Sequence, residues 1–350
     1  MSEARAQRFL GIQALRMVAA CLVVLTHSTF FASERLDHKF PVWEQGTRGV
    51  DVFFVISGFV MIYSSQKLLA LSRGWRVFAE HRILRIVPLY WLVTTLKVVL
   101  LLLVAGLSLH ARLTPVTIVC SYLFLPSRNL DGKLWPLVSQ GWTLQFEMLF
   151  YFLFTCALYF RTNVYKFIGI ILGVLSLGAY FSQPTWTPVA FYLNSVVLEF
   201  FFGMLIAKAC IADVYVPRKL AFLLLALGFI LLLLPPNDWN LPKALIGGVP
   251  ASLIVWSAAS LGSMENLIPR FFLYLGDASY SIYLIHTFVC PIPPAVLSRL
   301  HMDFPWLSVI LSVSIGVTAG CILHQMIEVP MTKRLKEYLK VRHRSLQAVA

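Results

Sequence analysis

Charged side chains are scarce in this chain of 350 residues. Asp, Glu, Lys and Arg together make up 13% of the sequence, whereas hydrophobic residues make up 59%. A typical soluble domain carries about 25% charged residues, so this chain lacks the polar surface needed to cover a globule in water. The composition excludes an ordinary soluble domain and indicates a protein that lies in a membrane.

The chain also lacks a low-complexity linker, a soluble module and a clear internal repeat. Its cysteines are dispersed in apolar context and show no metal or redox spacing, so we interpret them as buried filler and expect no metal. They are Cys21, Cys120, Cys156, Cys210, Cys290 and Cys321. We expect one membrane domain over residues 1–332 and a basic cytosolic tail over residues 333–350.

Long apolar runs dominate what is present. Each approaches the roughly 20 residues that a membrane-spanning helix needs, and backbone groups in lipid must be satisfied within the segment, which favours helices. The sequence therefore predicts an all-α polytopic membrane protein with about ten transmembrane helices. The predicted spans are 12–31, 50–66, 86–106, 142–160, 164–182, 189–208, 218–235, 243–262, 272–297 and 306–329.

The net charge of +13 follows membrane topology and does not indicate a nucleic-acid partner. Cytosolic segments of membrane proteins carry an excess of Lys and Arg. With the N-terminus in the cytosol, 19 of the 29 Lys and Arg residues fall in segments predicted to be cytosolic and 8 in outer loops. This distribution predicts that both termini are cytosolic and that the basic tail touches anionic lipid headgroups.

Two connections between the spans stand out. The longest outer one, 107–141, contains an apolar stretch at 116–125 that is too short to cross and is interpreted as re-entrant or interfacial. The inner connection 67–85 is basic and includes Arg76, Arg82 and Arg85. Arg82 and Arg85 would share one face of a helix, and Arg suits bidentate contact with phosphate. Ordinary flanking charge on an inner loop remains the alternative.

Arg16 and His27 are the most informative polar residues. Both lie in the first apolar run, which is too long for a signal peptide and is read as a retained span. Ionisable groups inside a membrane are costly and mark functional sites by default. The eleven steps between them correspond to roughly 16 Å along a helix. Snorkelling of Arg16 and simple packing of His27 remain the alternatives.

Further polar residues are buried in other predicted spans. Asp51 and Glu147 lie in the outer halves of the second and fourth spans, where each could serve the site or cap the start of its helix. His286, near the middle of the ninth span or slightly outward, could belong to the site or only pack. Lys97 and Glu199 could form a buried ion pair.

Several stretches resemble acyltransferase family 3, the integral membrane O-acyltransferases of bacterial surface polysaccharides. The match covers nearly the whole chain and is closest to the branch that acetylates exopolysaccharides. Besides Arg16 and His27 in the first span, the stretches are 49–59 (GVDVFFVISGF), 82–91 (RILRIVPLYW), 141–151 (GWTLQFEMLFY) and 275–286 (LGDASYSIYLIH).

The resemblance implies transfer of an acyl group, usually acetyl, from acyl-CoA to a sugar hydroxyl. The acceptor would be a surface polysaccharide or a lipid-linked saccharide, and the location the bacterial inner membrane. In the family the arginine and histidine of the first span are essential, which corresponds to Arg16 and His27. The family's Arg-x-x-Arg pair is implicated in donor handling and corresponds to Arg82 and Arg85.

These residues can be given chemical roles. A neutral His27 would act as general base toward the hydroxyl, since imidazole suits proton abstraction near pH 7. Glu147 or Asp51 would orient its ring. Arg16 would lie along the path of the pantetheine arm. Arg82 and Arg85, with the neighbouring Arg76, would hold the phosphates of coenzyme A.

Two other classes of protein remain open at this point. Ten spans with scattered buried charge also describe a transporter or flippase for a glycan or a small anion. A scaffold protein within a polysaccharide export complex is the third possibility. Consumption of an acyl thioester by the purified protein would distinguish the enzyme from both.

Overall fold

The computed structural model describes residues 9–103, 113–129, 132–183, 185–234, 242–262 and 267–349, with side chains described as far as residue 339. Within these ranges the structure is helical, and the one β-feature is an isolated antiparallel bridge between Arg128 and Leu134. The prediction of an all-α protein is confirmed. In chain order the α-helices are α2 (Leu10–Arg35), α3 (Gly49–Ser65), α4 (Gly74–Leu103), α5 (Pro115–Tyr122), α6 (Trp142–Tyr159), α7 (Val164–Gly178), α8 (Leu198–Ile211), α9 (Arg218–Leu233), α10 (Val249–Ser260), α11 (Arg270–Val289), α12 (Ile292–Arg299), α13 (Pro305–Leu323) and α14 (Val329–Val349).

Six helical segments of the described chain are long and apolar enough to cross a membrane. They contain α2, α3, α4, α6, α11 and α13, and each overlaps a predicted span. The other four predicted spans coincide with α7, α8, α9 and α10, which have 15, 14, 16 and 12 residues. These are shorter than the roughly 20 residues that span a bilayer, so ten crossings and two cytosolic termini stay predictions.

Helix α4 begins earlier than its predicted span. The prediction started at residue 86, where the apolar run begins, but the helix already begins at Gly74 and continues through Pro88. The basic stretch expected to be a loop is therefore largely helical. Hydropathy marks where lipid contact begins, whereas a helix can continue beyond the lipid with its backbone still hydrogen-bonded, and this is why the boundary was wrong.

Helices α3 and α8 pack unusually closely at two glycines. A Cβ atom on Gly58 would lie 1.9 Å from the carbonyl oxygen of Phe200, and one on Gly203 would lie 1.9 Å from that of Val55. Each helix thus presses a glycine against the backbone of the other. Small residues allow membrane helices this approach, and no side chain could replace them here without moving a backbone.

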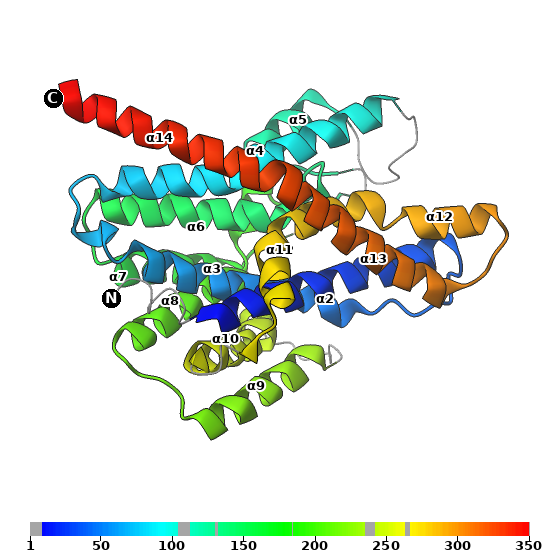
Figure 1. The fold of residues 1–350 in the computed structure, drawn as a ribbon, viewed down its shortest axis with the longest axis horizontal. Coiled ribbons are helices and arrows are strands. Elements are labelled where there is room, and N and C mark those ends of the chain that lie inside the picture. Colours follow the sequence, from blue (N-terminus) through cyan, green and yellow to red (C-terminus); the bar gives the residue numbers. More distant parts are fainter. Residues whose placement is uncertain are drawn as a thin grey trace.

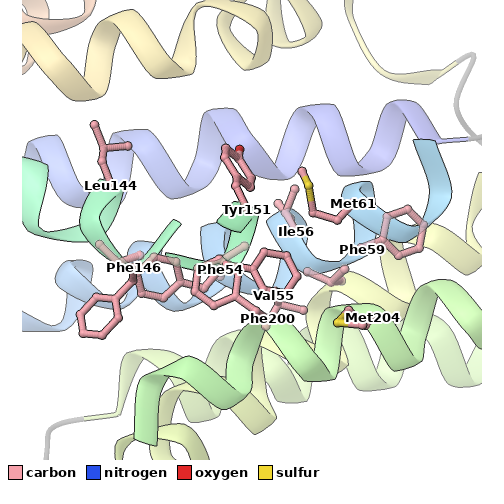
Figure 2. Packing of buried hydrophobic residues seen from close by; sticks show 14 of the residues in the cluster. Phe54, Val55, Ile56, Phe59, Met61, Leu144, Phe146, Tyr151, Phe200 and Met204 are labelled. Carbon is pink, nitrogen blue, oxygen red and sulfur yellow. The ribbon is translucent and has the colours of Figure 1, made fainter. Parts of the chain in front are cut away.

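Aromatic residues fill the space around this contact (Figure 2). The ring of Phe200 on α8 lies 4.7 Å from Phe54 on α3 and 4.7 Å from Phe150 on α6. All three side chains are buried. Aromatic pairs of this kind add about 0.5–1.5 kcal/mol beyond the area they bury. They hold α3, α6 and α8 in register on the side of α3 that faces away from α2.

The apolar stretch within the long outer connection does not cross the protein. It forms the short helix α5, which lies beside α4 in Figure 1. The indole Nε1 of Trp91, in the middle of α4, donates to the carbonyl oxygen of Tyr122 at 2.8 Å. The ring of Phe124 lies 4.5 Å from Tyr90. The connection therefore packs against the middle of α4.

The last helices form one long bent rod. A π-helical turn, His324–Glu328, joins α13 to α14, and α14 extends past the ends of its neighbours in Figure 1. The stretch predicted to be a basic tail is thus helical as far as residue 349. Its exposed Lys333, Arg334 and Lys336 lie on the outside of this helix.

Candidate active site

Five helices enclose an internal cavity of about 360 Å³. This volume lies within the range of about 300–1,000 Å³ that is usual for ligand pockets. The residues that line it are Phe9, Ile12, Gln13 and Arg16 from the start of the chain and α2; Val50, Phe53, Phe54, Ile56, Ser57, Phe59, Val60, Met61, Tyr63 and Ser64 from α3; Arg85 and Ile86 from α4; Thr143, Leu144, Glu147 and Tyr151 from α6; and Asp277, Ser279, Tyr280 and Tyr283 from α11.

The cavity is elongated along α3. Its lining on that helix runs from Val50 to Ser64, fourteen steps, which correspond to about 21 Å at 1.5 Å per residue. Tyr63 and Ser64 mark one end together with Arg85. Phe53 and Tyr283 belong to the other end. In the predicted topology the arginine end faces the cytosol. A narrow cavity of this length suits an extended flexible ligand better than a compact one.

The cavity lining carries charges of both signs. Arg16 and Arg85 face it together with Glu147 and Asp277. The hydroxyl of Ser57 donates to Glu147 at 3.2 Å, and the hydroxyl of Tyr151 donates to the same carboxylate oxygen. These bonds hold Glu147 as a fixed acceptor. The guanidinium groups then remain the donors that can meet a negatively charged ligand.

The Arg-x-x-Arg pair lies at the arginine end, as one unit of α4. Arg85 is exposed and lines the cavity. Arg82 donates to the hydroxyl of Ser64 at 2.6 Å, and its guanidinium lies 5.3 Å from the centre of the Phe78 ring. Because Ser64 is itself a lining residue, both arginines border the same opening. A planar guanidinium that stacks on a ring keeps its outer N–H groups available.

Arg76 lies elsewhere. It is exposed and its guanidinium lies 5.0 Å from the centre of the Trp75 ring, which in turn contacts Tyr159. Arg76 does not belong to the cavity lining. Its predicted contact with coenzyme A has no support in this arrangement, although it remains on the basic side of the molecule.

His27 lies farther along α2 than any lining residue. Eleven residues are almost three full turns, so His27 and Arg16 point to the same side of α2, roughly 16 Å apart. The Nδ1 atom of His27 lies 3.0 Å from the carbonyl oxygen of Val23 and 3.3 Å from Nε2 of His286 on α11. His27 is partly exposed, whereas His286 is fully buried.

Aromatic rings separate the two histidines from the cavity. Phe53 and Tyr283, at its far end, have ring centroids 5.9 Å apart, and Tyr283 lies 5.9 Å from the ring of His286. His286 lies 4.9 Å from His27. The hydroxyl of Tyr283 bonds to that of Thr143 at 3.0 Å. A single layer of side chains thus stands between the charged cavity and the imidazole pair.

The two acids predicted to orient His27 do not contact it. Among the described residues, the hydrogen bonds of His27 go to Val23 and His286. Glu147 lies in the cavity, and Asp51 faces a π-helical turn, Ala244–Gly248, where a Cβ on Gly247 would lie 2.2 Å from its Oδ2 atom. Neither acid therefore holds the orienting position expected beside His27, which in the structure is occupied by the imidazole of His286.

Asp51 has a second acid beside it. Glu199 on α8 is fully buried and packs on the neighbouring glycine, because a Cβ on Gly248 would lie 2.7 Å from its Cγ. Arg48 donates to the carbonyl oxygen of Ile246 in the same turn at 2.9 Å. The predicted pairing of Glu199 with Lys97 does not match this arrangement, since the ammonium of Lys97 lies over the ring of Phe288.

Sequence reasoning missed some of these partners. The sequence left open whether His286 belongs to the site, and it assigned no site role to Asp277, although both fall in the stretch 275–286 that carries the family resemblance. Ser57 was assigned no site role, yet it bonds to Glu147.

Within the described chain no group of three or more His, Cys, Asp or Glu residues is arranged to hold a metal ion.

Long apolar helices around a charged, ligand-sized interior define an integral membrane protein with a buried site. The acyltransferase domain of acyltransferase family 3 matches residues 9–326 of the chain. The chain belongs to this family and is an acyltransferase, so the resemblance seen in its motifs is confirmed.

Two relatives are also similar to the chain. Exopolysaccharide production protein ExoZ of Rhizobium meliloti (strain 1021) is 34% identical over 316 residues, which are 87% of this chain and 94% of that protein. Protein 2 in picA locus of Rhizobium radiobacter is 31% identical over 167 residues, which are 43% of this chain and 82% of that protein. No solved structure matches the chain significantly.

Proposed function

We propose that the chain transfers an acyl group, usually acetyl, from acyl-CoA to a hydroxyl of a surface polysaccharide or of its lipid-linked precursor. The family supports the reaction type. The similarity to a protein named for exopolysaccharide production supports a polysaccharide acceptor. The apolar helices and the family support a location in the bacterial inner membrane.

The shape and charge of the cavity are the observation that carries the choice of donor. Acyl-CoA has a phosphate-rich head, a long flexible arm and a reactive thioester at the far end. The cavity offers arginines at one end and about 21 Å of length along α3. Arg82 and Arg85 would hold phosphates outside or at the opening, and Arg16 would border the arm inside.

The reaction itself needs one base and little acid. His27 Nε2 takes the proton of the acceptor hydroxyl as its oxygen forms a bond to the thioester carbon. The tetrahedral intermediate then breaks its carbon–sulfur bond, and coenzyme A leaves as a thiolate that takes up the proton. The products are the sugar ester and free coenzyme A.

The two substrates would approach from opposite directions. The donor occupies the cavity, while the partly exposed His27 is reached by the acceptor beyond it. Phe53 and Tyr283 stand between the two positions, so a rotation of at least one of these side chains must join them before transfer. This requirement keeps the thioester away from water until the acceptor is in place.

Purified protein tests the proposal directly. Protein in detergent is mixed with acyl-CoA and a glycan acceptor, and free thiol and ester are measured together. We expect one thiol released for each ester formed, with no transfer by the protein carrying His27→Ala. Movement of a glycan or anion across vesicles without any thioester consumption would instead support a transporter.

The acceptor is found by comparing cells. Surface glycans from cells with and without the gene are analysed by mass spectrometry, and the mass difference identifies the acyl group and the sugar that carries it. Identical glycan masses in the two strains, under conditions where the protein is made, would remove the polysaccharide from the proposal.

A further inference from the structure

The two histidines that touch each other across α2 and α11 can be assigned their protons from geometry alone. In both rings Nδ1 faces a backbone carbonyl oxygen four residues earlier: Val23 for His27 at 3.0 Å, and Ile282 for His286 at 3.2 Å. A carbonyl oxygen can only accept a hydrogen bond. Each Nδ1 must therefore carry the proton for these contacts to be hydrogen bonds.

The contact between the two rings then determines the protonation of the remaining ring nitrogen of His286, Nε2. Its Nε2 lies 3.3 Å from Nδ1 of His27, which already bears a proton. If His286 also carried a proton on Nε2, two donors would face each other. His286 is consequently neutral with a lone pair on Nε2, and it shares the Nδ1 proton of His27 with the carbonyl oxygen of Val23.

We propose that His286 is a positioning residue that holds His27 in the Nδ1–H tautomer and so leaves the lone pair of His27 on Nε2, where the acceptor hydroxyl is deprotonated. The inference rests on the proposed base role of His27. It assigns to an uncharged imidazole the place that a carboxylate occupies beside the histidine of many hydrolytic triads.

The surroundings of His286 suit this fixed role. The ring is fully buried, and the backbone N–H of Cys290 donates to the His286 carbonyl oxygen at 2.8 Å within α11. Helices α2 and α11 are also pressed together about three turns before His286, where a Cβ on Gly276 would lie 2.1 Å from the carbonyl oxygen of Gln13. The two rings therefore meet at a register that the backbone sets.

When His27 takes a proton it becomes a cation, and its Nδ1–H then donates as a charged group to Nε2 of His286. A hydrogen bond from a charged donor contributes more than one between neutral groups. His286 therefore stabilises the proton-bearing state more than the resting state. Its removal should lower kcat about 10- to 100-fold and leave KM for the acyl donor unchanged, because the donor cavity does not include it.

Three variants separate positioning from packing. His286→Phe keeps a ring but removes the acceptor. His286→Gln places an amide oxygen near the position of Nε2 and should restore most of the lost kcat. Cys290→Ala, one turn farther along the same buried face of α11, removes volume without touching His27 and is the control. Equal losses in kcat for all three variants, or full kcat in His286→Phe, would overturn the inference.

A spectroscopic measurement is independent of catalysis. Nitrogen-15 NMR of histidine-labelled protein in lipid distinguishes protonated from unprotonated ring nitrogens. We expect His27, identified by the signal missing in His27→Ala, to be protonated on Nδ1 alone in the parent and to become a mixture of tautomers in His286→Phe. A His27 signal that does not change in His286→Phe would refute the positioning role even if transfer activity fell. If His27→Ala still transferred acyl groups, the base role would fail while this NMR result still reported on the tautomer.

Discussion

The charged cavity and the imidazole pair differ in chemistry although the same two helices serve both. On α2 and α11 the cavity takes Arg16 and Asp277, whereas His27 and His286, about two and a half to three turns farther along the same helices, have their rings in contact. Charge gathers where a phosphate-bearing donor would lie, and the proposed base lies where charge is absent. From this difference we expect that substitutions in the charged cavity alter donor binding. Substitutions at the two histidines should alter the chemical step.

The largest expected effect on kcat comes from a substitution in the histidine pair. His27→Ala should lower kcat by about 10²–10⁴-fold, because a positioned general base contributes that much, while KM for acyl-CoA stays within about twofold. Initial rates with radiolabelled acetyl-CoA give both constants. A rise in KM as large as the fall in kcat would contradict the separation of the two regions, since it would place His27 in the donor cavity.

A smaller effect is expected at the arginine end. Changing Arg82 and Arg85 together to Gln should raise KM for acyl-CoA about 10- to 100-fold with little change in kcat, since two charge-assisted phosphate contacts are removed. An acyl thioester of pantetheine without the nucleotide should be used equally well by parent and variant. Arg76→Gln, on the same helix but outside the cavity, is the matched control and should behave like the parent. If it impaired acyl-CoA use as strongly, overall basic charge would explain the effect.

Glu147 and Asp51 give a third test of whether the charged cavity and its surroundings act separately. Glu147→Gln should change KM for acyl-CoA several-fold, because it alters the charge beside Arg16 while the amide still accepts from Ser57 or Tyr151. Asp51→Asn should leave KM unchanged, because Asp51 packs on Gly247 and not on the cavity. Kinetics and the melting temperature of each variant are measured side by side. Equal effects on KM would show that the acids act on one site.

The smallest expected effect on kcat concerns Tyr283, which lies between the charged cavity and the two histidines. Tyr283→Phe keeps the ring that contacts His286 and loses the hydroxyl bonded to Thr143. One neutral hydrogen bond is worth about 0.5–1.5 kcal/mol, so we expect at most a tenfold fall in kcat and a normal KM. A larger loss in kcat would mean that this hydroxyl takes part in the chemical step.

The positions of most apolar helices along the chain could be predicted from the sequence, whereas the direction of a side chain around its helix could not. Hydropathy located most of the apolar helices, and the turn count correctly grouped Arg82 with Arg85. Glu147 and Asp51 were expected at similar depth near His27, but α6 directs the first into the cavity and α3 directs the second toward α10. The sequence of either helix alone does not determine which neighbouring helix a given side chain will face. The contact between His286 and His27 was not predicted for the same reason, because the two residues lie 259 positions apart in the chain.

The glycine contact between α3 and α8 has a consequence for how a donor could be admitted. Because Gly58 and Gly203 each lie against the backbone of the opposite helix, the two helices form a stiff unit that resists sliding or tilting. One complete wall of the cavity belongs to that unit. Widening of the cavity must therefore come from the other helices that line it, α2, α4, α6 and α11.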